Sequence, residues 1–330
     1  MYSKILIASL SIFLYLGCNP KNKTSHEVVA AKPSIEVPNF NADSAYHYTD
    51  RQVAFGPRVP NTEAHTACGD FFVEKLQSFG AEVIEQKMDV TTYDGKILKA
   101  RNIIASYQKE KKNRVLLFAH WDTRPFADHD PDPSNHRKAI DGANDGAGAC
   151  GILLEIARQT NIHPTEMGID IIFFDAEDWG VPTFEDKYNS TSGYCLGSNY
   201  WAKNPHVNNY TARYGILLDM VSAPKALFFQ EHYSRQYAPN IIKKVWDAAH
   251  SLGFGSRFIR EPMGAIEDDH IHVIKHRNIP CIDIIDYDPN SEKGFGDYWH
   301  TMEDNMSNIS KQTMQMVGQT VLHVIYNEKE

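Results

Sequence analysis

Ionisable side chains follow directly after three apolar segments that have the composition of buried strands. They are His120 after residues 115–119, Glu177 and Asp178 after residues 169–174, and Asp219 after residues 215–218. Any one of them could simply cap a turn. In an open α/β sheet, however, ligands bind beyond the carboxyl ends of the strands, and several such groups together indicate one site. We therefore expect acid–base or metal chemistry at this edge of the sheet.

Two further candidates, Asp145 and His300, lie outside these segments. Asp145 stands in the small-residue sequence Gly-Ala-Asn-Asp-Gly that opens a predicted helix, where the backbone can approach a bound ion closely. His300 is followed closely by Glu303 and Asp304. A metal-bound histidine needs a partner for its second ring nitrogen. We expect one of these two carboxylates to supply it.

Together these residues could hold a catalytic zinc ion. Such a site takes three protein ligands, typically His and carboxylate groups, and keeps one position open. Asp145, one carboxylate of the Glu177-Asp178 pair and His300 supply that set. Adjacent carboxylates in a loop can point in different directions, so the other member of the pair is available as a base.

The elements that must position these residues alternate between helices and strands. Helices are expected at residues 42–53, 62–79, 151–158, 234–251 and 310–326, and strands at residues 82–92, 99–107, 115–119, 169–174, 215–220 and 279–285. Asp94-Gly95, between the first two strands, is a strong hairpin signal. This order predicts a single α/β domain with three layers, α/β/α, and a central, mostly parallel mixed sheet.

The bulk composition is that of a globular protein that does not bind nucleic acid. The chain has 330 residues, of which 42% are hydrophobic, enough for a large core. Its 33 Lys and Arg residues are outnumbered by 42 Asp and Glu residues, whereas phosphate binding depends on Lys and Arg. Apart from Cys18, four scattered cysteines form no Cys-x-x-Cys pair, and their disulfide pairing stays open. They are Cys68, Cys150, Cys195 and Cys281.

The N-terminus has the pattern of an export signal. Lys4 precedes an apolar run from Ile5 to Leu16, which is too short for a comfortable transmembrane helix. The alternative, a buried first helix, is disfavoured because a polar stretch follows the run. We expect a lipoprotein-type signal peptide at residues 1–17, a polar tether at residues 18–38 and a zinc-dependent catalytic domain at residues 39–330.

Residues 15–18, Tyr-Leu-Gly-Cys, resemble a bacterial lipobox, although Tyr15 stands where a smaller aliphatic residue is usual. Cys18 is therefore expected to carry a lipid. The lipid would anchor an exported protein to a bacterial membrane, with the catalytic domain in the periplasm or at the cell surface.

Residues 128–132 have the Asp-x-Asp-x-Asp opening of a calcium loop. The loop lacks the Gly at the sixth position and the Glu at the twelfth position that calcium loops need. The sequence therefore predicts a solvated surface loop near the entrance of the site.

Five segments, taken in order, resemble the zinc exopeptidases of the bacterial aminopeptidase type. They are residues 120–122, 142–145, 173–178, 217–220 and 299–301. The resemblance extends over roughly residues 40–330 and implies a zinc exopeptidase-like fold. Within that clan the chain looks most like the animal-type glutaminyl-peptide cyclotransferases and their bacterial relatives. These share the segment Asp268-Asp269-His270 and the Trp before the final ligand.

The resemblance implies roles for the candidate residues. Asp145, Asp178 and His300 would be the zinc ligands, and Glu177 would act as the general base and acid.

Five other positions also match. His120 and Asp219 correspond to residues that hold a second zinc in the dinuclear aminopeptidases, whereas the cyclases retain both and work with one zinc. Asp219 and Asp268 would form a carboxyl pair that shares a proton near the substrate amine. Trp299 and Phe295 would line the substrate pocket, where a flat apolar slot suits a neutral carboxamide.

The reaction implied is that of an acyltransferase, which cyclises the N-terminal glutamine of peptides or proteins to pyroglutamate and releases ammonia. One zinc ion would polarise the γ-carbonyl, while Glu177 shuttles the proton. We expect a monomer. The alternative enzyme is a dinuclear zinc aminopeptidase in which Glu177 activates a water. A binding protein with a degenerate exopeptidase fold is disfavoured, because every ligand and the base are intact.

Overall fold

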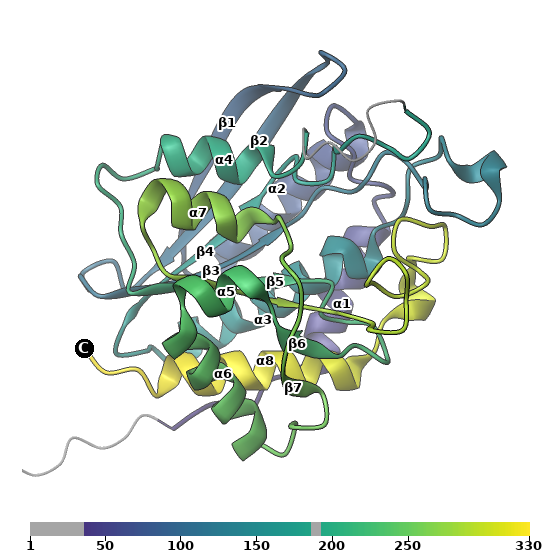
Figure 1. Cartoon of the computed structure of the whole chain (residues 1–330). Helices are drawn as coiled ribbons and strands as arrows, with labels where there is room; N and C mark the ends of the chain where they lie inside the picture. Colours follow the sequence, from purple (N-terminus) through teal and green to yellow (C-terminus); the bar gives the residue numbers. More distant parts are fainter. Residues whose placement is uncertain (1–35, 186–192) are drawn as a thin grey trace, which may run out of the picture. The chain divides into compact units, whose positions relative to one another are not determined.

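The computed structural model describes residues 36–185 and 193–330 (Figure 1). The expected signal peptide, Cys18 and most of the expected tether lie outside these residues, so those expectations and the domain boundaries stay predictions. Among the described helices, none combines the length and the apolar character that crossing a bilayer requires.

A six-stranded sheet forms the centre of the fold, with the strand order β1-β2-β4-β3-β5-β8. The strands are β1 (Glu82–Thr91), β2 (Ile97–Tyr107), β3 (Arg114–His120), β4 (Gly168–Phe174), β5 (Tyr214–Asp219) and β8 (Cys281–Ile285). The last four are parallel to one another, whereas β1 and β2 pair antiparallel, as does β2 with β4. The predicted central, mostly parallel mixed sheet is confirmed.

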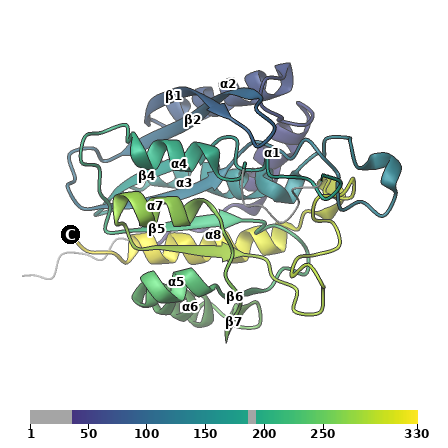
Figure 2. The same ribbon diagram turned by 45° about the horizontal axis from the view of Figure 1, so that its top comes forward.

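Helices cover both faces of this sheet (Figures 1 and 2). One face packs against α1 (Ala42–Val53), α2 (Glu63–Ser78), α3 (Ala149–Ile162), α6 (Pro239–Ser251) and α8 (Lys311–Tyr326), and the other against α4 (Leu196–Lys203) and α7 (Asp269–Arg277). Strand β3 shows why its sequence is continuously apolar. Val115 and Leu117 belong to the first core, and Leu116 and Phe118 belong to the second, so both faces of the strand are buried.

The prediction of a single helix at residues 234–251 is wrong, because this segment contains parts of two helices. A short helix, α5 (His232–Tyr237), ends before Ala238, and α6 begins at Pro239. Proline lacks an N–H and disfavours the helical conformation in the residue before it. Ala238 accordingly has φ −137° and ψ 46°.

Four elements escaped prediction because each is short. They are α4, α7 and the two strands of a separate parallel pair, β6 (Phe228–Gln230) and β7 (Phe258–Pro262). The four described cysteines are buried and form no disulfide with one another.

Candidate active site

The carboxyl ends of the parallel strands carry the ionisable groups into one site. His120 is the last residue of β3, Asp219 is the last residue of β5, and Glu177 and Asp178 follow β4. The parallel pairing of β3 with β4 and β5 aligns these ends. All four residues lie with Asp145 and His300 around the same small volume.

Two overlapping groups of side chains could each hold a metal ion. In the first, the Nε2 atom of His300 lies 3.3 Å from Oδ1 of Asp178 and 3.7 Å from Oδ2 of Asp145. In the second, Nε2 of His120 lies 2.9 Å from Oδ1 of Asp145 and 3.3 Å from Oδ1 of Asp219. Within each group the ligand atoms lie within 4.8 Å of one another. Asp145 therefore turns one oxygen toward each group.

The buried donor atoms fit a cation. Among the described residues, Oδ2 of Asp178 and Nδ1 of His300 are buried without a hydrogen-bond partner, while the buried Nε2 of His120 faces two carboxylate oxygens, Oδ1 of Asp145 and Oδ1 of Asp219. Leaving buried polar atoms unpaired is costly. Carboxylate oxygens and imidazole nitrogens are the ligands that zinc takes at catalytic sites, so these residues suit zinc.

The loop that carries Asp145 is held by Asp304. The Asp304 carboxylate accepts the backbone N–H groups of Asn144 at 2.8 Å and of Asp145 at 3.1 Å. Burial, and then the charge of Asp145, raise the pKa of Asp304 to about 8. The expectation that Glu303 or Asp304 supports the His300 ring is therefore wrong. Asp304 is occupied by the backbone of a different loop, and Glu303 is exposed.

The support for His300 comes instead from Asp128, whose Oδ1 atom lies 3.6 Å from Nδ1 of His300. Asp128 belongs to the loop predicted to be solvated, and that prediction holds only for its second half, where Pro131 and Asp132 are exposed. Asp128 and Asp130 are buried. Asp130 accepts the backbone N–H of Met302 at 2.9 Å, so the loop is fastened to the segment that carries His300.

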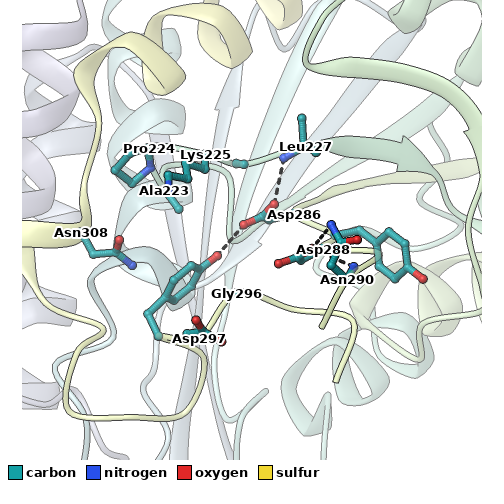
Figure 3. A pocket seen from close by; sticks show the side chains of 13 residues that line it. Ala223, Pro224, Lys225, Leu227, Asp286, Asp288, Asn290, Gly296, Asp297 and Asn308 are labelled. Atoms are coloured by element: carbon teal, nitrogen blue, oxygen red, sulfur yellow. Dashed lines mark hydrogen bonds between the residues drawn. The ribbon is translucent and has the colours of Figure 1, made fainter. Parts of the chain in front are cut away.

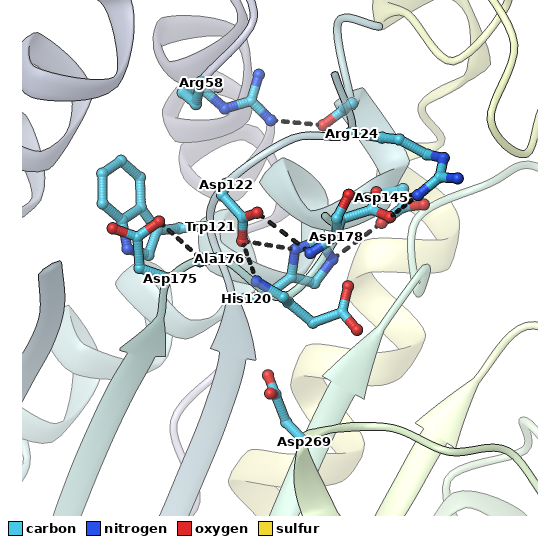
Figure 4. A network of polar contacts seen from close by, with 12 residues as sticks. Arg58, His120, Trp121, Asp122, Arg124, Asp145, Asp175, Ala176, Asp178 and Asp269 are labelled. Atoms are coloured by element: carbon cyan, nitrogen blue, oxygen red, sulfur yellow. Dashed lines mark hydrogen bonds and ion pairs between the residues drawn. The ribbon is translucent and has the colours of Figure 1, made fainter. Parts of the chain in front are cut away.

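The two carboxyl groups of the Glu177-Asp178 pair point in different directions. The Asp122 carboxylate accepts the backbone N–H of Glu177 at 3.0 Å and of Asp178 at 3.2 Å, which fixes the turn (Figure 4). Asp178 then faces His300, while Oε1 of Glu177 accepts the thiol of Cys195 at 3.2 Å.

Burial raises the pKa of Glu177 well above its usual value, and the charges of Asp178 and Asp268 add to this effect. A raised pKa brings a carboxyl group closer to what proton transfer near neutral pH requires.

Asp219, at the end of β5, and Asp268, at the N-terminus of α7, line the same cavity. Asp268 caps the N-terminus of α7, where it accepts the backbone N–H of Asp269 at 2.5 Å. Burial raises the pKa of Asp219 to about 6 and that of Asp268 to about 7, where the charge of Asp219 adds to the burial effect. Two carboxyl groups in such surroundings favour a state that retains a proton.

A cavity of about 300 Å³ opens beside these groups. Trp299 and Phe295 form part of its wall, and the Trp299 ring stacks on the His300 ring with centroids 3.8 Å apart. The rest of the lining consists of Asp145, Glu177, Asp178, Val181, Tyr194, Asp219, Met220, Ile266, Glu267, Asp268, Ile285 and His300. The sequence predicts no role for Tyr194, because a single aromatic residue between motifs gives no signal.

A larger cavity of about 480 Å³ lies next to this site but contains none of its predicted residues (Figure 3). Tyr298 lines it and donates to Asp286 at 2.6 Å. The same hydroxyl accepts the side-chain amide of Asn144 at 2.9 Å. Tyr298 thus ties the Asp145 loop to the end of β8.

Comparison with known proteins agrees with this geometry. The model of peptidase family M28 matches residues 102–325. The glutaminyl-peptide cyclotransferase of Boiga irregularis is 27% identical over 248 residues, which are 66% of this chain and 62% of that protein. The chain thus spans about three fifths of the length of that relative.

Several solved structures are more similar. The glutaminyl cyclase of Bacteroides thetaiotaomicron bound to N-acetylhistamine is 55% identical, with a TM-score of 0.87 over 89% of this chain and 100% of that chain. A zinc-dependent exopeptidase from Parabacteroides distasonis is 59% identical, with a TM-score of 0.87 over the same shares. A leucine aminopeptidase precursor from Bacteroides thetaiotaomicron is 54% identical, with a TM-score of 0.86 over 89% of this chain and 100% of that one.

Proposed function

This chain belongs to peptidase family M28, and from this premise we propose that it is a glutaminyl-peptide cyclotransferase. It would convert the N-terminal glutamine of peptides or proteins to pyroglutamate and release ammonia. The observation that carries the proposal is a cavity that combines a three-ligand metal group, a carboxyl group turned away from that group, and an aromatic wall. The similarity to cyclotransferases from snakes and bacteria supports it.

The proposed chemistry needs an electrophile and a proton carrier. Zinc held by Asp145, Asp178 and His300 would supply a Lewis acid that polarises the γ-carbonyl of the substrate glutamine. Glu177 accepts a proton from the α-amine as the amine nitrogen bonds to the carbon of that carbonyl, and then returns a proton to the ammonia that departs from the same carbon. One carbon–nitrogen bond forms and another breaks, so no water is consumed.

The cavity wall contributes by shaping the substrate. Trp299 and Phe295, with ring centroids 4.8 Å apart, offer an apolar surface on which the neutral carboxamide side chain can fold back toward its own amine. Holding a flexible chain in its ring-closing conformation gives a high effective molarity. The carboxyl pair formed by Asp219 and Asp268, one of them protonated, would hydrogen-bond the substrate near its α-amine.

Two measurements on one purified sample separate this reaction from its alternative. Incubation with Gln-Ala should release ammonia without releasing free amino acids. A dinuclear aminopeptidase would instead free N-terminal residues from peptides such as Leu-Ala and produce no ammonia. If amino acids appear and ammonia does not, the proposal fails.

The zinc content provides a separate prediction. The purified chain is expected to hold one zinc ion, bound by Asp145, Asp178 and His300, as measured by elemental analysis against protein concentration. The ligand atoms of these three residues lie within 4.8 Å of one another, and a catalytic zinc needs no more than three protein ligands. Two tightly held zinc ions, one of them lost when His120 or Asp219 is changed, would favour the aminopeptidase.

Export by a lipid anchor gives a further prediction. Changing Cys18 to Ser removes the only thiol in the Tyr-Leu-Gly-Cys sequence of residues 15–18. Incorporation of labelled fatty acid should then cease and the protein should leave the membrane fraction of the producing bacterium. Cys68→Ser is the matched control, because Cys68 is buried in the core and should not affect labelling. Unchanged membrane retention of Cys18→Ser would contradict lipidation.

A further inference from the structure

A buried ion pair between Arg124 and Asp128 lies against the metal site without lining its cavity. Nε of Arg124 lies 2.7 Å from Oδ1 of Asp128, and Nη2 lies 2.9 Å from Oδ2. Both side chains are fully buried. Two parallel hydrogen bonds of this kind fix the planes of both groups relative to each other. The proposed chemistry uses neither residue.

One end of this pair contacts Asp178. Nη1 of Arg124 lies 3.3 Å from both the backbone oxygen and Oδ1 of Asp178, and Figure 4 shows the guanidinium directed at that carboxylate. Oδ1 is also the atom that lies 3.3 Å from Nε2 of His300. Arg124 therefore holds the oxygen that belongs to the candidate metal group.

The other end of the pair contacts His300. Oδ1 of Asp128 lies 3.6 Å from Nδ1 of His300, while the backbone N–H of His129 donates to the carbonyl of His300 at 3.1 Å. At 3.6 Å the ring contact is electrostatic rather than a full hydrogen bond. A carboxylate beside Nδ1 favours the tautomer with its proton on that nitrogen, which leaves the lone pair of Nε2 for a metal.

Asp128 could instead be a metal ligand itself, since it lies within 4.8 Å of ligand atoms of His129 and His300. Its two oxygens are already engaged, however. Both accept from the Arg124 guanidinium, and Oδ2 also accepts the backbone N–H of Thr183 at 2.9 Å. These contacts suit a residue that orients a neighbour rather than one that binds an ion.

We propose that Arg124 and Asp128 are positioning residues that set two zinc ligands, Asp178 and His300, from different parts of the chain at the distance that zinc requires. The pair closes a ring: Asp178 contacts Arg124, Arg124 binds Asp128, Asp128 faces His300, and His300 faces Asp178. This inference rests on the proposed function, because it assumes that zinc occupies the group formed by Asp145, Asp178 and His300.

The test measures zinc affinity of the purified full chain by competition with a chromophoric chelator. The double variant Arg124→Met/Asp128→Asn removes both charges of the pair, so that neither is left buried alone. Its zinc Kd is expected to rise about 10- to 100-fold, the usual effect of losing groups that orient metal ligands.

A second ion pair, with Arg114 largely buried and Asp170 fully buried, lies at the opposite end of the same strands and provides the matched control. Arg114, the first residue of β3, binds Asp170 of β4 with Nε 2.5 Å from Oδ2 and Nη2 2.7 Å from Oδ1. The variant Arg114→Met/Asp170→Asn should lower the Tm of the zinc-free chain and leave the zinc Kd within about twofold of the parent value. A purely structural role for Arg124 and Asp128 would give the same pattern as this control.

Arg124→Lys covers the case in which the double variant does not fold. Lysine keeps the charge but lacks the planar fork that reaches two carboxylates at once, so zinc Kd should still rise about tenfold. If every folded variant binds zinc with the Kd of the parent, this inference fails while the proposed function stands. A parent chain that binds no zinc would overturn the proposed function, and this inference with it.

Discussion

Changing Glu177 to Gln is expected to lower kcat for Gln-Ala about 10²- to 10⁴-fold while KM and zinc content stay near the parent values. Glutamine has the shape of glutamate and still forms hydrogen bonds, but it cannot accept the amine proton. Glu177 is turned away from His300 and toward Cys195, with Oε1 3.2 Å from the thiol, so its loss should not remove a zinc ligand. Ammonia release under steady-state conditions gives kcat and KM, and elemental analysis gives the zinc content.

Glu303→Gln is the matched control, since Glu303 is exposed and does not line the cavity. It should cyclise Gln-Ala at the parent rate, and it also tests the finding that Glu303 does not support His300. A parent kcat in Glu177→Gln would show that another group carries the proton. A loss of zinc in that variant would show that Glu177 is a ligand instead.

The ends of the parallel strands were predictable because two independent signals coincide there. Residues 115–119 are continuously apolar and residues 169–174 are apolar except for Asp170, which marks strands buried on both faces, and ionisable residues follow at once. Parallel pairing then brings His120 of β3 close to Asp219 of β5 without any knowledge of the loops. This part of the site follows from local sequence and the geometry of the sheet.

The contacts that connect loops could not be predicted in this way. Asp304 lies closer in sequence to His300 than Asp128 does. Asp128 nevertheless faces the His300 ring, because the loop that contains Asp128 packs back against residues 300–302. Its separation of 172 residues from His300 leaves no local pattern. The buried position of Asp128 is equally hidden, since a segment rich in aspartate and proline, such as residues 128–133, is typical of a surface turn.

The N-terminus of α7 shows an intermediate case. Only the family resemblance points to the segment Asp268-Asp269-His270, because the nine residues of α7 have mixed polarity and show no helical period. Its structure explains the first residue of the segment. Asp268 caps the helix and at the same time faces the cavity, so one side chain serves both the fold and the site.

Removing the Asp178 carboxylate has the largest expected effect on the metal. Asp178→Ala should lose zinc on dialysis, and cyclisation should fall at least as far as in Glu177→Gln, because two ligands bind zinc much more weakly than three. Burial raises the pKa of Asp178 well above its usual value, and the charge of Asp145 raises it further. Without a cation the two carboxylates therefore oppose each other's ionisation. Arg124 keeps Asp128 as its partner in this variant, so no charge is left buried alone.

The thermal stability of the chain should depend on zinc binding and on the repulsion between the Asp145 and Asp178 carboxylates. Zinc that binds only the folded chain raises the Tm of the chain. The zinc-loaded parent should therefore melt at a higher temperature than the zinc-free parent. Asp178→Ala should melt at the same temperature with and without added zinc. That temperature should be no lower than the Tm of the zinc-free parent, because the variant lacks one of two repelling carboxylates. Asp219→Asn is the control: it lies in the second group and should retain one zinc and the zinc-dependent rise in Tm. Full zinc content in Asp178→Ala, or loss of zinc in Asp219→Asn alone, would move the metal from the group around His300 to the group around His120.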